Sequence, residues 1–402
     1  MPGKVTISER GRLMPASPIR KLVPYADRAR SRGVKVYHLN IGQPDVETPA
    51  EMLAAYRGLD LKVIGYGPSN GLTAYLDGLV HYYAGVGITV ETKDILVTVG
   101  GSEAIAFVYG AITDPGDEVL VPEPFYTNYA GYACMSSIQL VPVTCRAEDG
   151  FHLPPGREIE SRLTERTRAI LVSNPGNPTG VVYTADEMAM LARLCLERNL
   201  YLVADEVYRE FIYDPGVKHH SVMNLAGLED RAIMVDSVSK RYSACGARVG
   251  CIVSRNHDLM QTVLKFGQAR LCPPTVDQLA ALAALSTPAS YFAAVRDEYR
   301  RRRDLVCDAL CAMPGVLCQR PAGAFYVVAR LPVDDAEQFA IFMLDEFQEN
   351  NETVMVAPAN GFYATKGAGQ NEVRIAYVLN CDDLARAMSL LAHGIEAYNR
   401  RK

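Results

Sequence analysis

The feature that most constrains the fold is a regular alternation, between residues 94 and 254, of short apolar runs with longer helix-compatible segments. The runs are rich in Val, Ile and Leu, which is typical of strands buried on both faces. They are DILVT (94–98), EVLVP (118–122), IQLVPV (138–143), AILVS (169–173), YLVAD (201–205), AIMVDS (232–237) and GCIVS (250–254). The segments SEAIAFVYGAI and TADEMAMLARLCLERN are amphipathic, and Thr184 with Glu187 predicts a capping box at the second. The pattern predicts an α/β fold with a mainly parallel seven-stranded sheet and helices on both faces.

The pattern changes after about residue 288, which indicates a second domain. A charged helix, YFAAVRDEYRRRRDLVCDAL, is followed by the hairpin-like CQRPAGAFYVVARLP, the helix AEQFAIFMLDEFQEN, the strand EVRIAYVL and a final helix. We therefore expect a large domain over 47–287 and a smaller α+β domain over 288–402. Residues 1–46 are expected to pack with the smaller domain.

Composition excludes several classes of function. The 402 residues are 49% hydrophobic and 22% charged, with 41 Lys and Arg against 46 Asp and Glu, a net charge of −5. No basic stripe suggests nucleic-acid binding, and no apolar run reaches the roughly 18 to 20 residues of a membrane helix. The ten cysteines are scattered without a C-x-x-C pair, so we expect no metal site. The first 22 residues hold no apolar run, so we expect no secretory signal and a cytoplasmic location.

Polar residues follow several of the predicted strands, and the carboxyl ends of parallel strands are where ligands gather. After the first strand, Gly101 and Ser102 open a helix, an arrangement that suits an anion but is also a common turn. The G-x-G-x-x-G and P-loop patterns are absent, which disfavours dinucleotides and nucleoside triphosphates. After the fourth strand, NPGNPTG (174–180) predicts a rigid loop that can present the amide of Asn177.

The ends of the next two predicted strands carry side chains that can take part in catalysis. Asp205 ends a very apolar strand, so its carboxylate is either a helix cap or needs a cationic or donor partner, and Tyr208 lies three residues further on. The stretch SVSKRYSACGARVG (237–250) then places Lys240 among serines and Arg248 between glycines. A lysine in such a setting can form a Schiff base, and an arginine suits a phosphate. An aldehyde cofactor with a phosphate and a basic ring nitrogen would use all of these groups.

The ordered set GGSEA, NPGNPTG, ADEVY, SVSK and GARVG resembles the class I/II pyridoxal-phosphate-dependent aminotransferases of fold type I. The resemblance runs from IGQPD, near residue 41, to EVRIAY, near residue 377, and is closest to bacterial aspartate-aminotransferase-like members. It implies pyridoxal 5'-phosphate as the cofactor, an amino acid and a 2-oxo acid as substrates, and a homodimer with shared active sites.

The resemblance also implies a role for each matching residue. Lys240 matches the lysine that forms the aldimine and carries the Cα proton toward and away from a quinonoid, and Asp205 matches the carboxylate on the ring nitrogen. Tyr208 and Asn177 match the pair at the ring 3-oxygen, and Tyr126 matches the stacking aromatic. The phosphate positions are Gly101, Ser102, Ser237, Ser239 and Arg248, with Tyr66 contributed to the neighbouring subunit's phosphate. On the substrate side, Arg374 matches the arginine of the α-carboxylate, with Gly42 and Asn177 beside it.

The choice of substrate is less constrained. Some relatives bind a distal carboxylate through a lysine at the position of Ser102, and that lysine is absent here. Arg270, which precedes a Pro-Pro loop, is the predicted substitute, although a structural ion pair would explain it equally well. The other candidates are Arg20, Lys21 and Lys366.

Three hypotheses remain from the sequence. The first is an aminotransferase for aspartate or a related amino acid. The second is a lyase or synthase on the same scaffold that performs elimination, replacement or ring-forming chemistry. The third is a non-catalytic binding protein, which the presence of both Lys240 and Asp205 disfavours.

Overall fold

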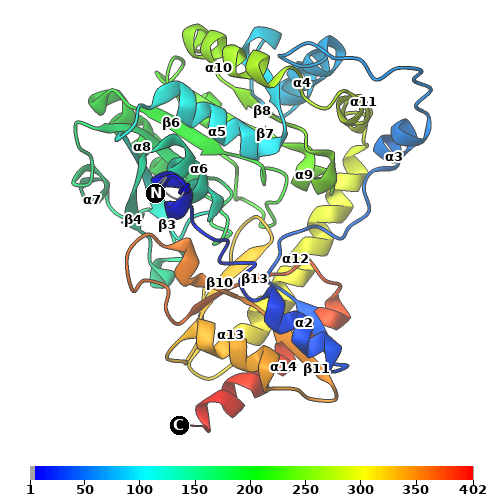
Figure 1. Cartoon of the computed structure of the whole chain (residues 1–402), viewed down its shortest axis with the longest axis vertical. Coiled ribbons are helices and arrows are strands. Elements are labelled where there is room, and N and C mark those ends of the chain that lie inside the picture. Colours follow the sequence, from blue (N-terminus) through cyan, green and yellow to red (C-terminus); the bar gives the residue numbers. More distant parts are fainter. Residues whose placement is uncertain (1–4, 402) are drawn as a thin grey trace.

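The structure is a computed structural model that describes residues 5–401. Residues 1–4 of the predicted N-terminal segment, and residue 402 at the end of the predicted smaller domain, lie outside the described residues. The described chain forms three sheets, and two of them are joined by a long helix, α12 (Ala289–Ala312), that runs between the two halves of the molecule (Figure 1). The predicted boundaries at 46/47 and 287/288 stay predictions.

The seven predicted strands all form and pair in one sheet, in the order β2-β8-β7-β6-β5-β3-β4. They are β2 (Ile95–Thr98), β3 (Glu118–Glu123), β4 (Gln139–Thr144), β5 (Thr167–Ser173), β6 (Tyr201–Asp205), β7 (Ala232–Ser237) and β8 (Gly250–Val253). Only β8 is antiparallel, and it is antiparallel to both of its neighbours. The prediction of a mainly parallel seven-stranded sheet is confirmed.

Both faces of this sheet are covered because its strands are apolar on both faces. Val203, Ile233 and Val235 pack against α5 (Gly100–Ile112), α6 (Asn128–Ser136) and α10 (His257–Arg270). Leu202 and Met234, their neighbours along the strands, pack on the opposite face. The helices of that face are α3 (Ala50–Arg57), α4 (Thr73–Gly85), α8 (Ala185–Arg198) and α11 (Thr275–Ala284). The capping box at α8 forms as predicted, with Thr184 Oγ1 3.2 Å from the backbone nitrogen of Glu187.

The second sheet is smaller and antiparallel, with the strand order β12-β13-β10-β9. Its strands are β9 (Leu317–Cys318), β10 (Tyr326–Arg330), β12 (Ala357–Pro358) and β13 (Glu372–Ala376). It shares one core with α12, α13 (Ala336–Asp345) and α14 (Cys381–Asn399). Helix α9 (Val238–Arg241) is a short helix of the large-sheet region, and it contributes to the site. Helix α7 (Gly156–Glu160) is also short and lies next to α8.

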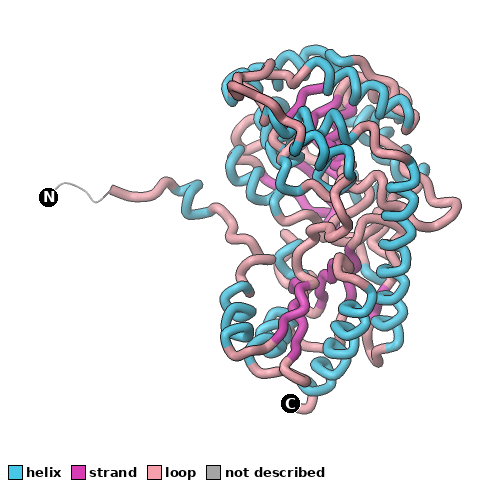
Figure 2. Tube along the Cα trace, turned by 90° about the vertical axis from the view of Figure 1, so that its right-hand side faces the viewer, coloured by secondary structure: helices cyan, strands magenta, loops and turns pink. Residues whose placement is uncertain are grey.

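The chain before residue 46 contacts this second region. Strand β1 (Lys35–His38) pairs in parallel with β11 (Glu352–Met355), and α2 (Val23–Ser31) packs on α13. Arg28 also pairs with Asp345, Nη2 to Oδ2, at 2.9 Å. The segment that carries α1 (Glu9–Leu13) projects from the body (Figure 2), and α1 contacts α6, where Arg10 Nη1 donates to the carbonyl oxygen of Met135 at 3.1 Å.

Within residues 5–401, no single helix has both the length and the apolar composition needed to cross a bilayer. Helices α11 and α12 meet those criteria only as a pair, and they are bent by 91° at the break between them.

Candidate active site

A cavity of about 340 Å³ lies where the carboxyl ends of the large-sheet strands meet the second sheet and the N-terminal segment. It gathers most of the residues singled out in the sequence, although they are spread over more than 300 positions. Those that line it are Gly42, Gly101, Ser102, Tyr126, Asn177, Asp205, Tyr208, Ser237, Ser239, Lys240, Arg248 and Arg374. Of the predicted site residues, Tyr66 and Arg270 are not among the lining residues.

One end of the cavity forms a cradle suited to a phosphate. Helix α5 begins at Gly100, whose φ of +72° favours glycine, and its first turn directs backbone N–H groups toward the cavity. A Cβ atom on Gly100 would overlap the guanidinium of Arg248, so the close approach of that cation requires glycine. Ser237 and Ser239 complete the cradle, with their hydroxyl oxygens 2.9 Å apart.

The carboxylate of Asp205 forms the floor of the cavity at the end of β6. Tyr129 donates a hydrogen bond to its Oδ2 at 2.7 Å, and the backbone N–H of Val207 approaches Oδ1 at 3.4 Å. Burial raises the pKa of Asp205 to about 6, and the nearby carboxylates of Asp236 and Glu206 add to the shift. A cationic ring nitrogen placed here would supply the partner that this buried acid lacks.

Lys240 extends from α9 across the cavity. Its Nζ donates a hydrogen bond to the carbonyl oxygen of Gly42 at 2.8 Å and lies 3.6 Å from Cys245 Sγ. The amine is partly buried between the two halves of the molecule. It is therefore within reach of a ligand held between the large sheet and the second sheet.

Arg374 in β13 is 2% exposed and also lines the cavity. Its Nη2 donates to the carbonyl oxygen of Asn40 at 2.5 Å and its Nη1 to Asn177 Oδ1 at 3.2 Å. No described residue accepts a hydrogen bond from its buried Nε. Because burial lowers the pKa of this guanidinium and leaves one donor free, the site favours an added carboxylate.

Three tyrosines that line the cavity were not predicted: Tyr129, Tyr132 and Tyr326. Tyr326 places its hydroxyl 2.8 Å from that of Tyr208, and a Cβ atom on Gly42 would overlap it. Its partner Tyr208 lies 118 positions away, so no local pattern could reveal the contact. Tyr129, which contacts Asp205, follows Tyr126 by three residues, and its backbone N–H donates to the carbonyl oxygen of Tyr126 at 3.0 Å in the turn that opens α6.

The remaining candidates divide clearly. Tyr66 is 83% exposed on the loop before α4 and does not line the cavity. Arg270 pairs with Glu103, Nη1 to Oε2, at 2.8 Å, and its Nη2 donates to the carbonyl oxygen of Ser69 at 3.0 Å. Its predicted role in substrate binding stays a prediction, because the structure does not bring it into the cavity of this chain.

Of the other three cations, Lys21 pairs with Glu337, and Lys366 is exposed and not among the lining residues. Arg20 does line the cavity, and no described residue pairs with its guanidinium.

These groups fit pyridoxal 5'-phosphate and an amino acid. The cradle around Arg248 suits the phosphate, Asp205 suits the ring nitrogen, and Lys240 suits the aldehyde. The free Nε of buried Arg374 suits the α-carboxylate of a substrate.

Comparisons with known proteins agree with this reading. Residues 34–391 match the model of the aminotransferase class I and II family. An aspartate aminotransferase of Pyrococcus abyssi is 33% identical over 394 residues, which cover 96% of this chain and 97% of that protein. Two solved structures share the fold. One is the aspartate aminotransferase of Thermus thermophilus with maleate, which has a TM-score of 0.88 and 30% identity over 97% of this chain and 100% of that one. The other is the alanine aminotransferase of Pyrococcus furiosus, which has a TM-score of 0.89 and 28% identity over 98% of this chain and 100% of that one. The chain therefore belongs to the class I and II aminotransferases and is a pyridoxal-phosphate-dependent enzyme of that family.

Proposed function

We propose that the enzyme transfers the amino group of an acidic L-amino acid, with aspartate favoured, to a 2-oxo acid. The observation that carries this proposal is the unpaired guanidinium of Arg20 on the cavity that also holds Arg374. Among the described lining residues, the side-chain cations are Arg20, Lys240, Arg248 and Arg374, whereas Asp205 is the one carboxylate. With a phosphate on Arg248 and an α-carboxylate on Arg374, Arg20 is left for a second carboxylate.

The proposed roles are those that the family resemblance implies, and the contacts around the cavity support them. Bound pyridoxal phosphate supplies an aldehyde for the substrate amine and a ring that delocalises the electrons of the broken Cα–H bond. Arg374 orients the substrate through its α-carboxylate, and Lys240 Nζ removes and returns the Cα proton. Asp205 would hold the ring nitrogen in its protonated form, Tyr208 and Asn177 would contact the ring 3-oxygen, and Tyr126 would pack on the ring.

The relatives support transamination, and they are named for different amino acids. One is named for aspartate and was solved with maleate, a dicarboxylate, and another is named for alanine. The unpaired guanidinium of Arg20, which suits a second carboxylate, favours the acidic choice. The lyase or synthase alternative has no support from these names.

We also propose a homodimer in which Tyr66 reaches the phosphate of the neighbouring subunit. The loop that carries it is apolar and open to solvent, with Leu61, Val63 and Ile64 exposed by 46%, 80% and 70%. Exposed apolar side chains concentrated on one loop are typical of an interface. A cytoplasmic location belongs to the same proposal, and ten free cysteines support a reducing compartment.

The test is a half-reaction. The purified, cofactor-loaded enzyme is mixed with L-aspartate without any oxo acid, and the visible absorbance of the cofactor and the release of oxaloacetate are followed. We expect loss of the visible band together with an equimolar amount of oxaloacetate. A band that persists with L-aspartate but disappears with L-alanine would overturn the acidic assignment.

The matched control is Lys240→Ala, which removes the amine and leaves Arg20 and Arg374 in place. This variant should produce no oxaloacetate in the half-reaction. Turnover at the wild-type rate would exclude Lys240 as the catalytic base.

A further inference from the structure

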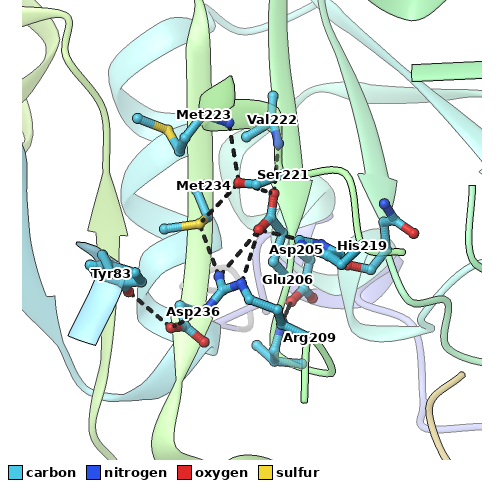
Figure 3. A network of polar contacts seen from close by, with 12 residues as sticks. Tyr83, Asp205, Glu206, Arg209, His219, Ser221, Val222, Met223, Met234 and Asp236 are labelled. Atoms are coloured by element: carbon cyan, nitrogen blue, oxygen red, sulfur yellow. Dashed lines mark hydrogen bonds and ion pairs between the residues drawn. The ribbon is translucent and has the colours of Figure 1, made fainter. Parts of the chain in front are cut away.

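A cluster of buried charges lies directly behind the wall of the cavity. Its members are Glu206, Arg209, Asp236 and Arg241, which are 1%, 8%, 1% and 3% exposed. None of the four is among the lining residues of the cavity. Figure 3 shows Arg209 between the carboxylates of Glu206 and Asp236.

Asp236 is the centre of the cluster. Its Oδ2 lies 3.4 Å from Arg209 Nη1, accepts a hydrogen bond from Tyr83 at 2.9 Å, and pairs with Arg241 Nη2. Its Oδ1 accepts the backbone N–H of Ser237 at 2.7 Å. The two guanidinium groups hold the pKa of Asp236 at about 2 against the effect of burial. One carboxylate thus joins α4, the turn after β6, the end of β7 and α9.

Glu206 anchors the other end. Arg209 Nη2 lies 3.2 Å from its Oε2. Its Oε1 accepts the hydroxyl of Ser221 at 3.0 Å and the backbone N–H of Val222 at 2.8 Å. Every carboxylate oxygen of the cluster therefore has a partner, as a buried ionic group requires.

The members have a fixed relation to the cavity in sequence. Each is the direct neighbour of a residue that lines the cavity. The four pairs are Asp205–Glu206, Tyr208–Arg209, Ser237–Asp236 and Lys240–Arg241. Asp236 and Ser237 lie in β7, where neighbouring side chains point to opposite sides. The other three pairs lie at the end of β6, in the turn after it and in α9. In every pair, one member lines the cavity and the other belongs to the cluster. A contact in the cluster therefore fixes the backbone that carries a cavity side chain.

We propose that this charge cluster is a positioning device for the cofactor site. The side chains that it positions are Asp205, Tyr208, Ser237 and Lys240. The inference rests on the cofactor roles proposed above for those four residues. A cluster that served stability alone could be replaced by apolar groups without effect on the cofactor. A positioning cluster could not, because displacement of a reacting group by about 1 Å can cost roughly 100-fold in rate.

The experiment compares Arg241→Met with Arg303→Met. Arg303 is also buried, at 2% exposed, and pairs with Asp214 at 2.7 Å, but it does not line the cavity and no cluster residue contacts it. For each protein we would measure the dissociation constant of pyridoxal phosphate from the reconstituted apoprotein. We would also measure the pH midpoint of the cofactor's visible absorbance and the midpoint temperature of thermal unfolding of the apoprotein.

Both variants should lose thermal stability. Arg241→Met should also bind the cofactor about tenfold or more weakly and shift the absorbance midpoint, because the end of β7 and α9 are no longer held together. Arg303→Met should change neither the cofactor affinity nor the absorbance midpoint. Equal cofactor affinity and equal midpoints for wild type and Arg241→Met would overturn the proposal.

Two further variants protect the test against a failure to fold. Asp236→Asn keeps the size of the side chain and removes the charge, so it should reproduce the shift. Arg241→Lys keeps the charge and should restore most of the cofactor affinity. If the wild-type enzyme bound pyridoxal phosphate without any visible band, the proposed roles of Lys240 and Asp205 would be contradicted. If wild type and variants behaved identically, only the positioning role of the cluster would be contradicted.

Discussion

Two buried carboxylates on neighbouring strands have opposite surroundings. Asp236, in β7, meets two arginines and a tyrosine, and its pKa is lowered to about 2. Asp205, at the end of β6, meets only the hydroxyl of Tyr129 and one long backbone contact, and burial raises its pKa to about 6. Asp236 therefore has cationic partners within the chain. Asp205 has none, and Asp205 is the carboxylate that faces the cavity.

The same division holds for the arginines. Arg209 and Arg241 are paired behind the cavity, and Arg270 is paired with Glu103 beside it. Arg374 has no ion pair among the described residues and keeps a buried Nε without a hydrogen bond, and Arg20 has no ion pair among them either. Arg241 Nε also lacks a hydrogen bond, but the guanidinium of Arg241 is paired with Asp236. Polar groups left incomplete in a folded chain mark the places where ligands bind. Paired and unpaired groups should therefore respond differently to substitution.

The largest expected effect is that of Asp205→Asn on catalysis. We expect kcat/KM to fall by roughly 100- to 1000-fold, because a preorganised charge at the reacting ring is lost. The apoprotein should nevertheless be no less stable at pH 7, since the buried carboxylate has no cationic partner there. Steady-state kinetics and urea unfolding of the same preparation measure both quantities.

Asp236→Asn provides the contrast in stability. It should destabilise the apoprotein by about 3 kcal/mol or more, because two buried guanidinium groups lose their shared partner. A result in which Asp205→Asn is the more destabilising of the two would reverse the comparison.

The second prediction concerns pH. The pKa of Asp205 in the folded apoprotein, about 6, is above its ordinary value of 3.8, so this group costs stability as pH rises from about 4 to about 6. The full cost, about 3 kcal/mol, applies above pH 6. Asp236, with a pKa of about 2, contributes about 2 kcal/mol that is present above pH 4 and lost as pH falls toward 2.

Urea unfolding of the apoproteins over about pH 3 to 8 measures these slopes. The stability of Asp205→Asn relative to wild type should increase between about pH 4 and 6 and then level off. The deficit of Asp236→Asn should shrink below about pH 4. Parallel curves for the two variants would show that the two carboxylates do not differ in their native environments.

The sequence predicts one side of the site better than the other. Asp205, Ser237 and Asn177 follow apolar strands, and parallel strands bring their carboxyl ends to one edge, so the motifs and the sheet together place these residues. The full sheet follows from the same runs. Periodicity alone could not give the antiparallel direction of β8, because an apolar run has no direction.

The substrate side depends on packing between distant segments. Arg20 comes from the N-terminal segment, Gly42 from the loop after β1, and Tyr326 from the second sheet. Which of four candidate cations faces the cavity is decided by pairs such as Arg270 with Glu103, and a sequence does not reveal these pairs. The cluster around Asp236 could not be predicted from the sequence for the same reason.

The third prediction is that Arg20→Gln changes substrate preference. We expect kcat/KM for L-aspartate to fall about tenfold relative to that for L-alanine, the value of a hydrogen bond to a charged group at an exposed position. Arg12→Gln is the matched control, because Arg12 is an exposed arginine of the same segment that does not line the cavity. An unchanged ratio of the two substrates in Arg20→Gln would remove Arg20 from the substrate site.

The smallest expected effect on catalysis is that of Arg270→Gln. Its guanidinium is half-buried and already committed to Glu103 and to the carbonyl oxygen of Ser69, so its loss should lower the stability of the protein by about 1 to 3 kcal/mol. The ratio of kcat/KM for aspartate to that for alanine should stay at the wild-type value, because no free donor of Arg270 faces the cavity of its own chain. A selective loss of aspartate turnover would mean that Arg270 serves the site across the proposed dimer. In that case a paired side chain would act on the substrate, and the distinction between complete and incomplete groups would fail at this position.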